Sequence, residues 1–181
     1  MTVDRAAAVR AALRALVAEH GFHGASMSAV AKAAGVATGT AYTHYASKDA
    51  LVLAAYVETK AQLAAAAMDA LDPSAAPAER FRSIWLATYR HFAANPEHAR
   101  FLLQVDHSPY HAAAHAALSE DDPLLAQAAA MQPELLPLPA EVLYELGIAP
   151  ALRLAVGAVR LTDAELASVA QACWRAISRE S

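Results

Sequence analysis

The sequence has little of what cross-links a chain or carries it into a membrane. Cys173 is its one cysteine, so no intrachain disulfide can form, and 181 residues can bury a core without disulfides or metals. No apolar stretch approaches the roughly 20 uninterrupted residues that cross a bilayer. Asp4 and Arg5 stand where a signal segment would be apolar. We therefore expect a cytoplasmic protein with no membrane partner.

The alternating patterns typical of strands are also missing. The composition is 57% hydrophobic, and much of that is alanine, which has the highest helix propensity. Apolar residues instead recur at the helical period, as Val9, Leu13, Leu16 and Val17 do near the N-terminus. These observations predict an all-α chain of about nine helices, in which Pro150 should kink or divide a helix over residues 140–158.

An overall excess of positive charge is missing too, which argues against a protein that coats nucleic acid indiscriminately. The net charge is -4. Residues 1–60 carry six basic and four acidic side chains, whereas the remaining residues carry eight basic and fourteen acidic ones. A mildly basic first part on an acidic body fits a DNA-reading module joined to a domain with another task.

The first part of the chain carries the signals of a helix-turn-helix. Its periodicity, caps and breakers predict helices over residues 3–20, 27–34 and 38–44. Ser26 can cap the second helix, and Gly35 can stop it because glycine adopts the left-handed conformation without steric cost. The small Ala31 allows the third helix to cross closely. Purely structural helical hairpins share this pattern, so the pattern alone fits either role.

Sequence motifs in the same region favour the DNA-binding role. The stretch of residues 5–55 contains, in order, Gly21-Phe22, Ser26-Met27, Val30-Ala31, Ala34-Gly35-Val36, Gly39-Thr40-Ala41-Tyr42, His44-Tyr45 and Ser47-Lys48-Asp49-Ala50-Leu51. Together they resemble the N-terminal signature of the tetracycline-repressor (TetR) family of regulators. The resemblance implies a helix-turn-helix DNA-binding domain over residues 1–46 and a helical effector-binding and dimerisation domain over residues 47–181.

The resemblance also implies roles for single residues. In that family the third helix enters the major groove, so Thr38, Gly39 and Thr40 correspond to its groove-facing start. Tyr42, His44 and Lys48 correspond to phosphate contacts, and Ser26 and Ser28 to further contacts from the second helix. The chemistry agrees, because hydroxyl, imidazole and ammonium groups can all donate to phosphate. Tyr45 is expected in the core instead.

Three departures from the family pattern affect this interface. Ala25 and Ala37 replace common hydroxyl residues, and Ala41 replaces a larger apolar side chain, so phosphate contacts should be fewer and helix packing tighter. The third helix also has no arginine or lysine, the commonest readers of guanine. The sequence therefore leaves the operator unspecified.

The last two predicted helices, over about residues 140–158 and 163–178, resemble the pair through which members of the family form a four-helix dimer interface. The candidate interface residues lie on the second of these helices. Its apolar residues cover more than one narrow stripe, and they are Leu166, Val169, Ala170, Cys173, Trp174 and Ile177. The resemblance implies that they meet their two-fold mates in a homodimer. Alternatively they pack inward on their own domain, and both can hold if one stripe faces the core and another faces the partner.

The body of the chain also supplies candidates for a small-molecule pocket, which is typically apolar with a few polar groups. The candidates are Trp85, Tyr89, Phe92, Phe101, Leu102, Val105, Tyr110, His111, Met131 and Tyr144. At helical spacing, such residues are more often plain core. The leading hypothesis is a non-enzymatic repressor that binds an inverted-repeat operator as a dimer and is released by a small, largely apolar effector.

A rival hypothesis rests on His107, His111 and His115, which recur at four-residue steps with Asp106 beside them. Imidazoles at positions i and i+4 can share one metal ion, so the chain could be a helical metal-binding or catalytic protein. Pro109 should leave His107 outside the helix, however, and no complete metal motif or nucleophile–base pair accompanies the cluster. We therefore assign no metal and no cofactor from the sequence.

Overall fold

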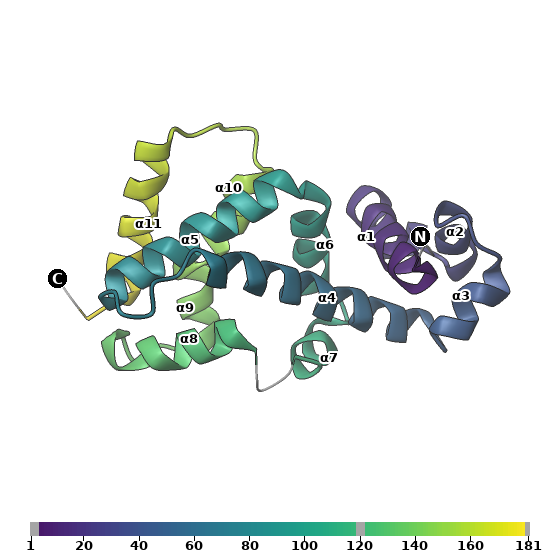
Figure 1. Cartoon of the computed structure of the whole chain (residues 1–181), viewed down its shortest axis with the longest axis horizontal. Coiled ribbons are helices and arrows are strands. Elements are labelled where there is room, and N and C mark those ends of the chain that lie inside the picture. The colour runs from purple at the N-terminus through teal and green to yellow at the C-terminus, as the bar shows by residue number, and fades with distance from the viewer. Residues whose placement is uncertain (1–3, 119–121, 180–181) are drawn as a thin grey trace. The chain divides into compact units, whose positions relative to one another are not determined.

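The computed structural model describes residues 4–118 and 122–179, and this part of the chain holds eleven α-helices, one 3-10 helix and no named strand (Figure 1). The helices are α1 (Arg5–Gly24), α2 (Met27–Ala33), α3 (Thr38–His44), α4 (Lys48–Asp69), α5 (Pro77–Ala94), α6 (Pro96–Asp106), α7 (His111–Ala116), α8 (Pro123–Met131), α9 (Ala140–Gly147), α10 (Ala149–Val156) and α11 (Asp163–Ile177). The 3-10 helix η1 covers Gln132–Glu134. The all-α prediction is confirmed. None of these helices is both long and apolar enough to cross a membrane.

The helices form two compact units, each with its own core. The first unit takes its described residues from 1–60 and 97–119, and the second from 61–96 and 120–181. The predicted domain boundary after residue 46 rests on sequence motifs, whereas the two compact units are defined by which residues pack together. Packing places the first part of α4 and nearly all of α6 and α7 with the N-terminal helices.

Local chemistry explains where the helices of the first unit begin and end. Asp4 caps α1 by accepting from the backbone N–H groups of Ala6 and Ala7. Gly21, at a φ of 67° and a ψ of -178°, breaks the regular helix where the sequence predicts its end. Its conformation turns the chain toward α2, which packs on α1 and α3.

The second unit is centred on α5, which packs against α10 and α11. The Trp85 indole N–H donates to the Gly147 carbonyl oxygen at 3.2 Å, and the rings of Phe81 and Trp174 lie 5.4 Å apart. Pro150 stands in the first turn of α10, so the predicted long helix is divided as expected. A capping box between Thr162 and Glu165 begins α11.

Candidate nucleic-acid interface

The turn between α2 and α3 has the geometry that the sequence predicts. The Ser26 hydroxyl accepts from the Ala29 backbone N–H at 3.2 Å and so caps α2. Gly35 has a φ of 68°, the left-handed conformation that ends the helix. Ala31 and Ala41 are buried, so both helices turn small side chains toward the core of this unit. The result is two short helices joined by a glycine turn.

The residues predicted to contact DNA lie mainly on the surface. Ser26, Ser28, Thr38, Gly39, Tyr42 and His44 are exposed, and Thr40 and Lys48 are half-buried. Tyr42 stands out because it carries a large aromatic ring and is nevertheless 51% exposed. Tyr45 is buried, as expected for a core residue. Thus α3 exposes hydroxyl, phenol and imidazole groups and buries one small side chain, Ala41.

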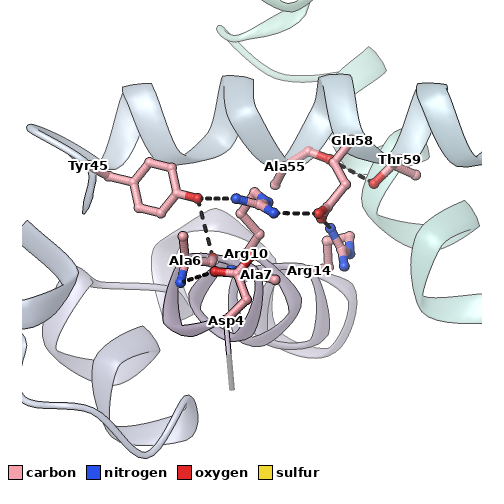
Figure 2. A network of polar contacts seen from close by, with 9 residues as sticks. All are labelled: Asp4, Ala6, Ala7, Arg10, Arg14, Tyr45, Ala55, Glu58 and Thr59. Atoms are coloured by element: carbon pink, nitrogen blue, oxygen red, sulfur yellow. Dashed lines mark hydrogen bonds and ion pairs between the residues drawn. The ribbon is translucent and has the colours of Figure 1, made fainter. Parts of the chain in front are cut away.

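A partly buried ionic network ties the end of α3 to α1 and α4 (Figure 2). Arg10 of α1 donates to the Tyr45 hydroxyl at 2.5 Å and to the Glu58 carboxylate at 2.6 Å. Arg14, one turn further along α1, donates to the other Glu58 oxygen. The Tyr45 hydroxyl in turn donates to the Ala6 carbonyl oxygen at 3.3 Å. Because Tyr45 is the C-cap of α3, the network fixes the direction in which α3 leaves the core.

The charges of this network depend on one another. Burial alone would raise the pKa of Glu58, but the hydrogen bonds from Arg10 and Arg14 outweigh it and lower the pKa below its ordinary value. The hydrogen bond to Glu58 is also the main reason why the pKa of Arg10 is raised. The side chain of Arg14 is only 7% exposed. One carboxylate therefore compensates two guanidinium groups that are largely withdrawn from water.

Lys48 has a structural contact that the sequence did not reveal. Its ammonium group donates to the Phe22 carbonyl oxygen and lies 5.9 Å from the centre of the Phe22 ring. The contact joins the first turn of α4 to the chain just after the Gly21 break. A phosphate role for Lys48 therefore requires its flexible side chain to share or exchange this contact.

Arg5 is a residue of this surface that sequence reasoning missed. It lines a hollow of about 210 Å³ together with Gly35, Val36, Ala37 and Thr40. Its side chain is exposed and cationic, and it borders the start of α3, which itself has no arginine or lysine. In the sequence, the sign of this role is that Arg5 is a basic residue at the start of the predicted first helix. The fold is what brings this first turn of α1 next to residues 35–40.

Most of the pocket candidates are buried in one of the two units. Phe101, Leu102 and Val105 are core residues of the first unit, where Tyr110 is half-buried and His111 exposed. In the second unit Trp85, Tyr89, Phe92 and Met131 are buried, whereas Tyr144 is exposed. The candidates thus contribute to two separate cores, and an effector site formed by them stays a prediction.

The dimer candidates lie mainly on the inward side of α11. Leu166, Ala170, Cys173, Trp174 and Ile177 are buried within the chain, and burial raises the pKa of the Cys173 thiol. Val169 is half-buried. It begins a second stripe that continues through the exposed Ala172 and Ala176 at helical spacing. The stripe formed by Val169, Ala172 and Ala176 is therefore an apolar part of α11 that its own chain leaves at least partly uncovered.

The histidine cluster differs in one member from the set that the sequence indicates. Among the described residues, the side chains with converging ligand atoms are Asp106, His111 and His115. His107 is exposed and lies outside this group. The helix begins at His111, after a turn in which the Ser108 hydroxyl accepts from the Tyr110 N–H, and this turn leaves His107 behind.

A helical unit with two short helices joined by a glycine turn, and a polar surface on the second, defines a DNA-binding protein of the helix-turn-helix class. The model for bacterial regulatory proteins of the tetR family matches residues 9–55. The model for the tetracyclin repressor-like C-terminal domain matches residues 77–178, more than half of the chain. The chain therefore belongs to the TetR family of transcription regulators.

Solved structures of the same family agree along almost the whole chain. A TetR-family regulator of Haemophilus influenzae is 26% identical with a TM-score of 0.81, and 97% of each chain is covered. One from Marinobacter aquaeolei VT8 is 25% identical with a TM-score of 0.77, covering 96% of this chain and 95% of the other. A TetR-family protein of Vibrio parahaemolyticus is 27% identical with a TM-score of 0.72, covering 98% and 100%. No curated protein matches the chain significantly.

The inferred phosphate role of Lys48 predicts a loss of affinity that is the same for all DNA sequences. Lys48→Ala should weaken binding to operator and to random DNA alike, and the slope of log affinity against log salt should decrease by about one unit. The control is Arg100→Ala, which removes one exposed positive charge from α6. A loss confined to one base position of the operator would show that Lys48 does not contact a phosphate.

Thr40 should contribute to specificity instead, because it lies in the first turn of α3. Thr40→Ala should lower the ratio of operator to random-DNA affinity by about 5- to 150-fold, corresponding to roughly 1–3 kcal/mol for a lost base contact. Thr43→Ala is the matched control, since the Thr43 hydroxyl already donates to the Gly39 carbonyl oxygen. Uniformly weaker binding with an unchanged ratio would assign Thr40 to the DNA backbone.

Proposed function

We infer that this regulator is a repressor that binds an inverted-repeat operator through α3 and is released by a small, largely apolar effector. The observation that carries the DNA-binding part is the exposed polar surface of α3, held by the Arg10–Tyr45–Glu58 network on its inner end. A helix fixed in this way can enter the major groove without first being ordered, so less binding energy is lost.

Operator binding by such a protein requires two copies, because one short α3 reads only one half-site. Two copies related by a two-fold axis place their α3 helices one groove repeat apart, roughly 34 Å. The stripe of Val169, Ala172 and Ala176 supports an interface on α11, since small side chains allow two helices to approach closely. Each contact across a two-fold axis is made twice.

This interface predicts the effect of a single charge. Ala172→Glu should turn the dimer into a folded monomer and raise the dissociation constant of the dimer at least about a hundredfold, because two carboxylates would be buried across the axis. Ala172 is exposed in the single chain, so its own fold should not suffer. Val169→Glu should act in the same direction.

The control for this experiment is Gln171→Glu, which adds a carboxylate at an exposed position on the opposite side of α11. Sedimentation velocity reports the assembly and circular dichroism the helical content. If Ala172→Glu and Val169→Glu both remain folded dimers, the partner meets another surface.

The effector part of the proposal rests on the composition of the second unit. Trp85 and Tyr89 stack with their ring centres 6.3 Å apart and their planes at 3°, next to other large apolar residues of the unit. Aromatic and other large apolar side chains are typical of the lining of sites for small apolar molecules. An effector that prefers one arrangement of the two DNA-binding units would shift the dimer away from the groove spacing and so release it.

The test of this function is a gel shift with purified protein and the DNA upstream of its own gene. The expected result is a discrete complex that survives a large excess of random DNA and holds two chains. If random DNA at the same concentration as the labelled DNA abolishes the complex, the operator role is contradicted. Release of that complex by added apolar metabolites, and not by salt alone, tests the effector part.

A further inference from the structure

Three side chains converge at the junction of α6 and α7, outside the surface proposed for DNA. Asp106 is the last residue of α6, and His111 and His115 belong to α7. Their nearest ligand atoms all lie within 4.8 Å of one another, and the two imidazole rings are 4.5 Å apart. All three residues belong to the first compact unit, as do the DNA-binding helices.

The donor set selects a class of metal ion. Histidines at i and i+4 lie one above the other on a helix face and can share an ion, while the carboxylate comes from the preceding helix. Bound to zinc, such atoms lie about 3.3–3.5 Å apart, which follows from metal–ligand distances of about 2.0–2.2 Å. Rotation of the exposed imidazole side chains can bring the ligand atoms from their present separation to this shorter one. Two imidazoles and one carboxylate favour zinc and its transition-metal neighbours over Mg²⁺ and Ca²⁺.

The surroundings of the cluster suit a bound cation. Asp106 is half-buried at the end of α6, so its carboxylate is only partly hydrated. A carboxylate that has lost part of its hydration gains strongly from a directly bound cation. The hydroxyl of the buried Tyr56 lies 3.4 Å from His115 Nε2, an outer contact of the kind that orients a ligating imidazole.

The residue next to the cluster in the chain contacts the DNA-binding helices. Tyr110 directly precedes His111, and its ring lies 4.9 Å from that of Phe22. Its hydroxyl donates to Asp49 of α4 at 2.9 Å. Phe22 in turn accepts the hydrogen bond from Lys48. An ordered start of α7 would therefore also hold the end of α1, which follows the Gly21 break, and the first turn of α4.

The α7 helix is short enough for an ion to matter. It has six residues, of which Ala114 alone is buried. Helices of this length are not stable by themselves, because nucleation is unfavourable and few hydrogen bonds follow. A cross-link between His111 and His115, anchored to Asp106, would hold this turn of helix together and tie it to the end of α6.

We propose that Asp106, His111 and His115 bind one divalent transition-metal ion, and that the ion orders α7 so that Tyr110 is held on Phe22 and Asp49. The ion changes operator affinity through this contact. The metal site stands on the cluster itself, whereas the change in operator affinity rests on the proposed function.

Metal binding is tested without DNA, on full-length protein from which any histidine tag has been removed. Co(II) should bind one ion per chain with visible absorption bands typical of a four- or five-coordinate site, and Zn(II) should displace it. Mg(II) and Ca(II) at millimolar concentration should not displace Co(II). The absence of stoichiometric Co(II) binding to the folded protein would overturn the proposal.

Variants locate the ion. His111→Ala, His115→Ala and Asp106→Asn should each weaken Co(II) binding at least tenfold, whereas His107→Ala, which removes the neighbouring exposed histidine outside the group, should bind as the unchanged protein does. Circular dichroism of the metal-free variants confirms that they are folded. Loss of binding in His107→Ala, or retained binding in all three cluster variants, would overturn the assignment.

Coupling to DNA is measured as operator affinity with and without Zn(II). The unchanged protein should show at least a fivefold change, and His115→Ala and Tyr110→Ala should show none. Bound Zn(II) without any change in operator affinity would overturn the regulatory part alone. If no operator is bound under either condition, the proposed function fails while the Co(II) result still decides the metal site.

Discussion

Replacing Gly39 with glutamate should abolish sequence-specific DNA binding while leaving the chain folded. Gly39 is exposed on α3, its φ is not in the left-handed region, and a Cβ atom added to it would meet no atom within 4 Å. The folded chain therefore has no use for a glycine at this position. DNA binding would require a glycine there, because the missing side chain allows the protein backbone to approach the phosphates closely. A carboxylate at the same position would repel the phosphates.

Gly39→Ala separates the two effects. Alanine is favoured over glycine by about 0.5–1 kcal/mol in a helix interior and by less in the first turn, where Gly39 lies. This variant should therefore be at least as stable to urea as the unchanged protein. Its operator affinity should nevertheless fall, by less than that of Gly39→Glu. Fluorescence anisotropy with labelled operator and urea unfolding measure the two quantities. Full operator affinity in Gly39→Glu would remove α3 from the interface.

Glu58→Ala should destabilise the protein by about 3 kcal/mol, since it leaves the Arg10 and Arg14 guanidinium groups without their carboxylate in a largely buried place. Glu58→Gln should cost less, because an amide oxygen can still accept one hydrogen bond. Glu19→Ala is the control, as that carboxylate is 74% exposed. Urea unfolding of Glu58→Ala within about 0.5 kcal/mol of the unchanged protein would show that the network contributes little.

The same network sets a pH dependence. The pKa of Glu58 is lower in the folded chain than in the unfolded one, where a glutamate titrates near 4.3. Its contribution to stability is therefore complete above about pH 4.3 and is lost as the pH falls through the lower folded value. Glu58→Gln should remove this part of the acid sensitivity. Urea midpoints measured between about pH 3 and pH 7 for both proteins would show it.

The helix-turn-helix could be predicted because its signals are local. The Ser26 cap, the left-handed Gly35 and the buried Ala31 act on neighbours within a few residues, so the sequence shows them directly. The ionic network could not be predicted in this way. Its partners are 44 and 48 positions apart, and charge pattern alone gives no reason to pair Arg14 or Arg10 with Glu58.

Two other features depended on how helices face one another. Apolar residues of α11 indicate a buried face, but periodicity does not say whether its own chain or a partner covers that face. Burial assigns most of them to the second unit and leaves the Val169, Ala172 and Ala176 stripe outside. Likewise four-residue spacing groups His107 with His111 and His115, although Pro109 indicates that His107 lies outside the helix. In the structure α7 begins at His111, and the converging side chains are Asp106, His111 and His115.

The most direct test of the account is selection of DNA from a random library by the purified protein, followed by sequencing and repeated with Gly39→Glu. The account predicts that the unchanged protein enriches an inverted repeat whose half-sites lie about one helical turn apart. Gly39→Glu, folded by circular dichroism, should enrich none. Enrichment of the same repeat by both proteins would contradict recognition through α3, and no enrichment by the unchanged protein would contradict operator binding itself.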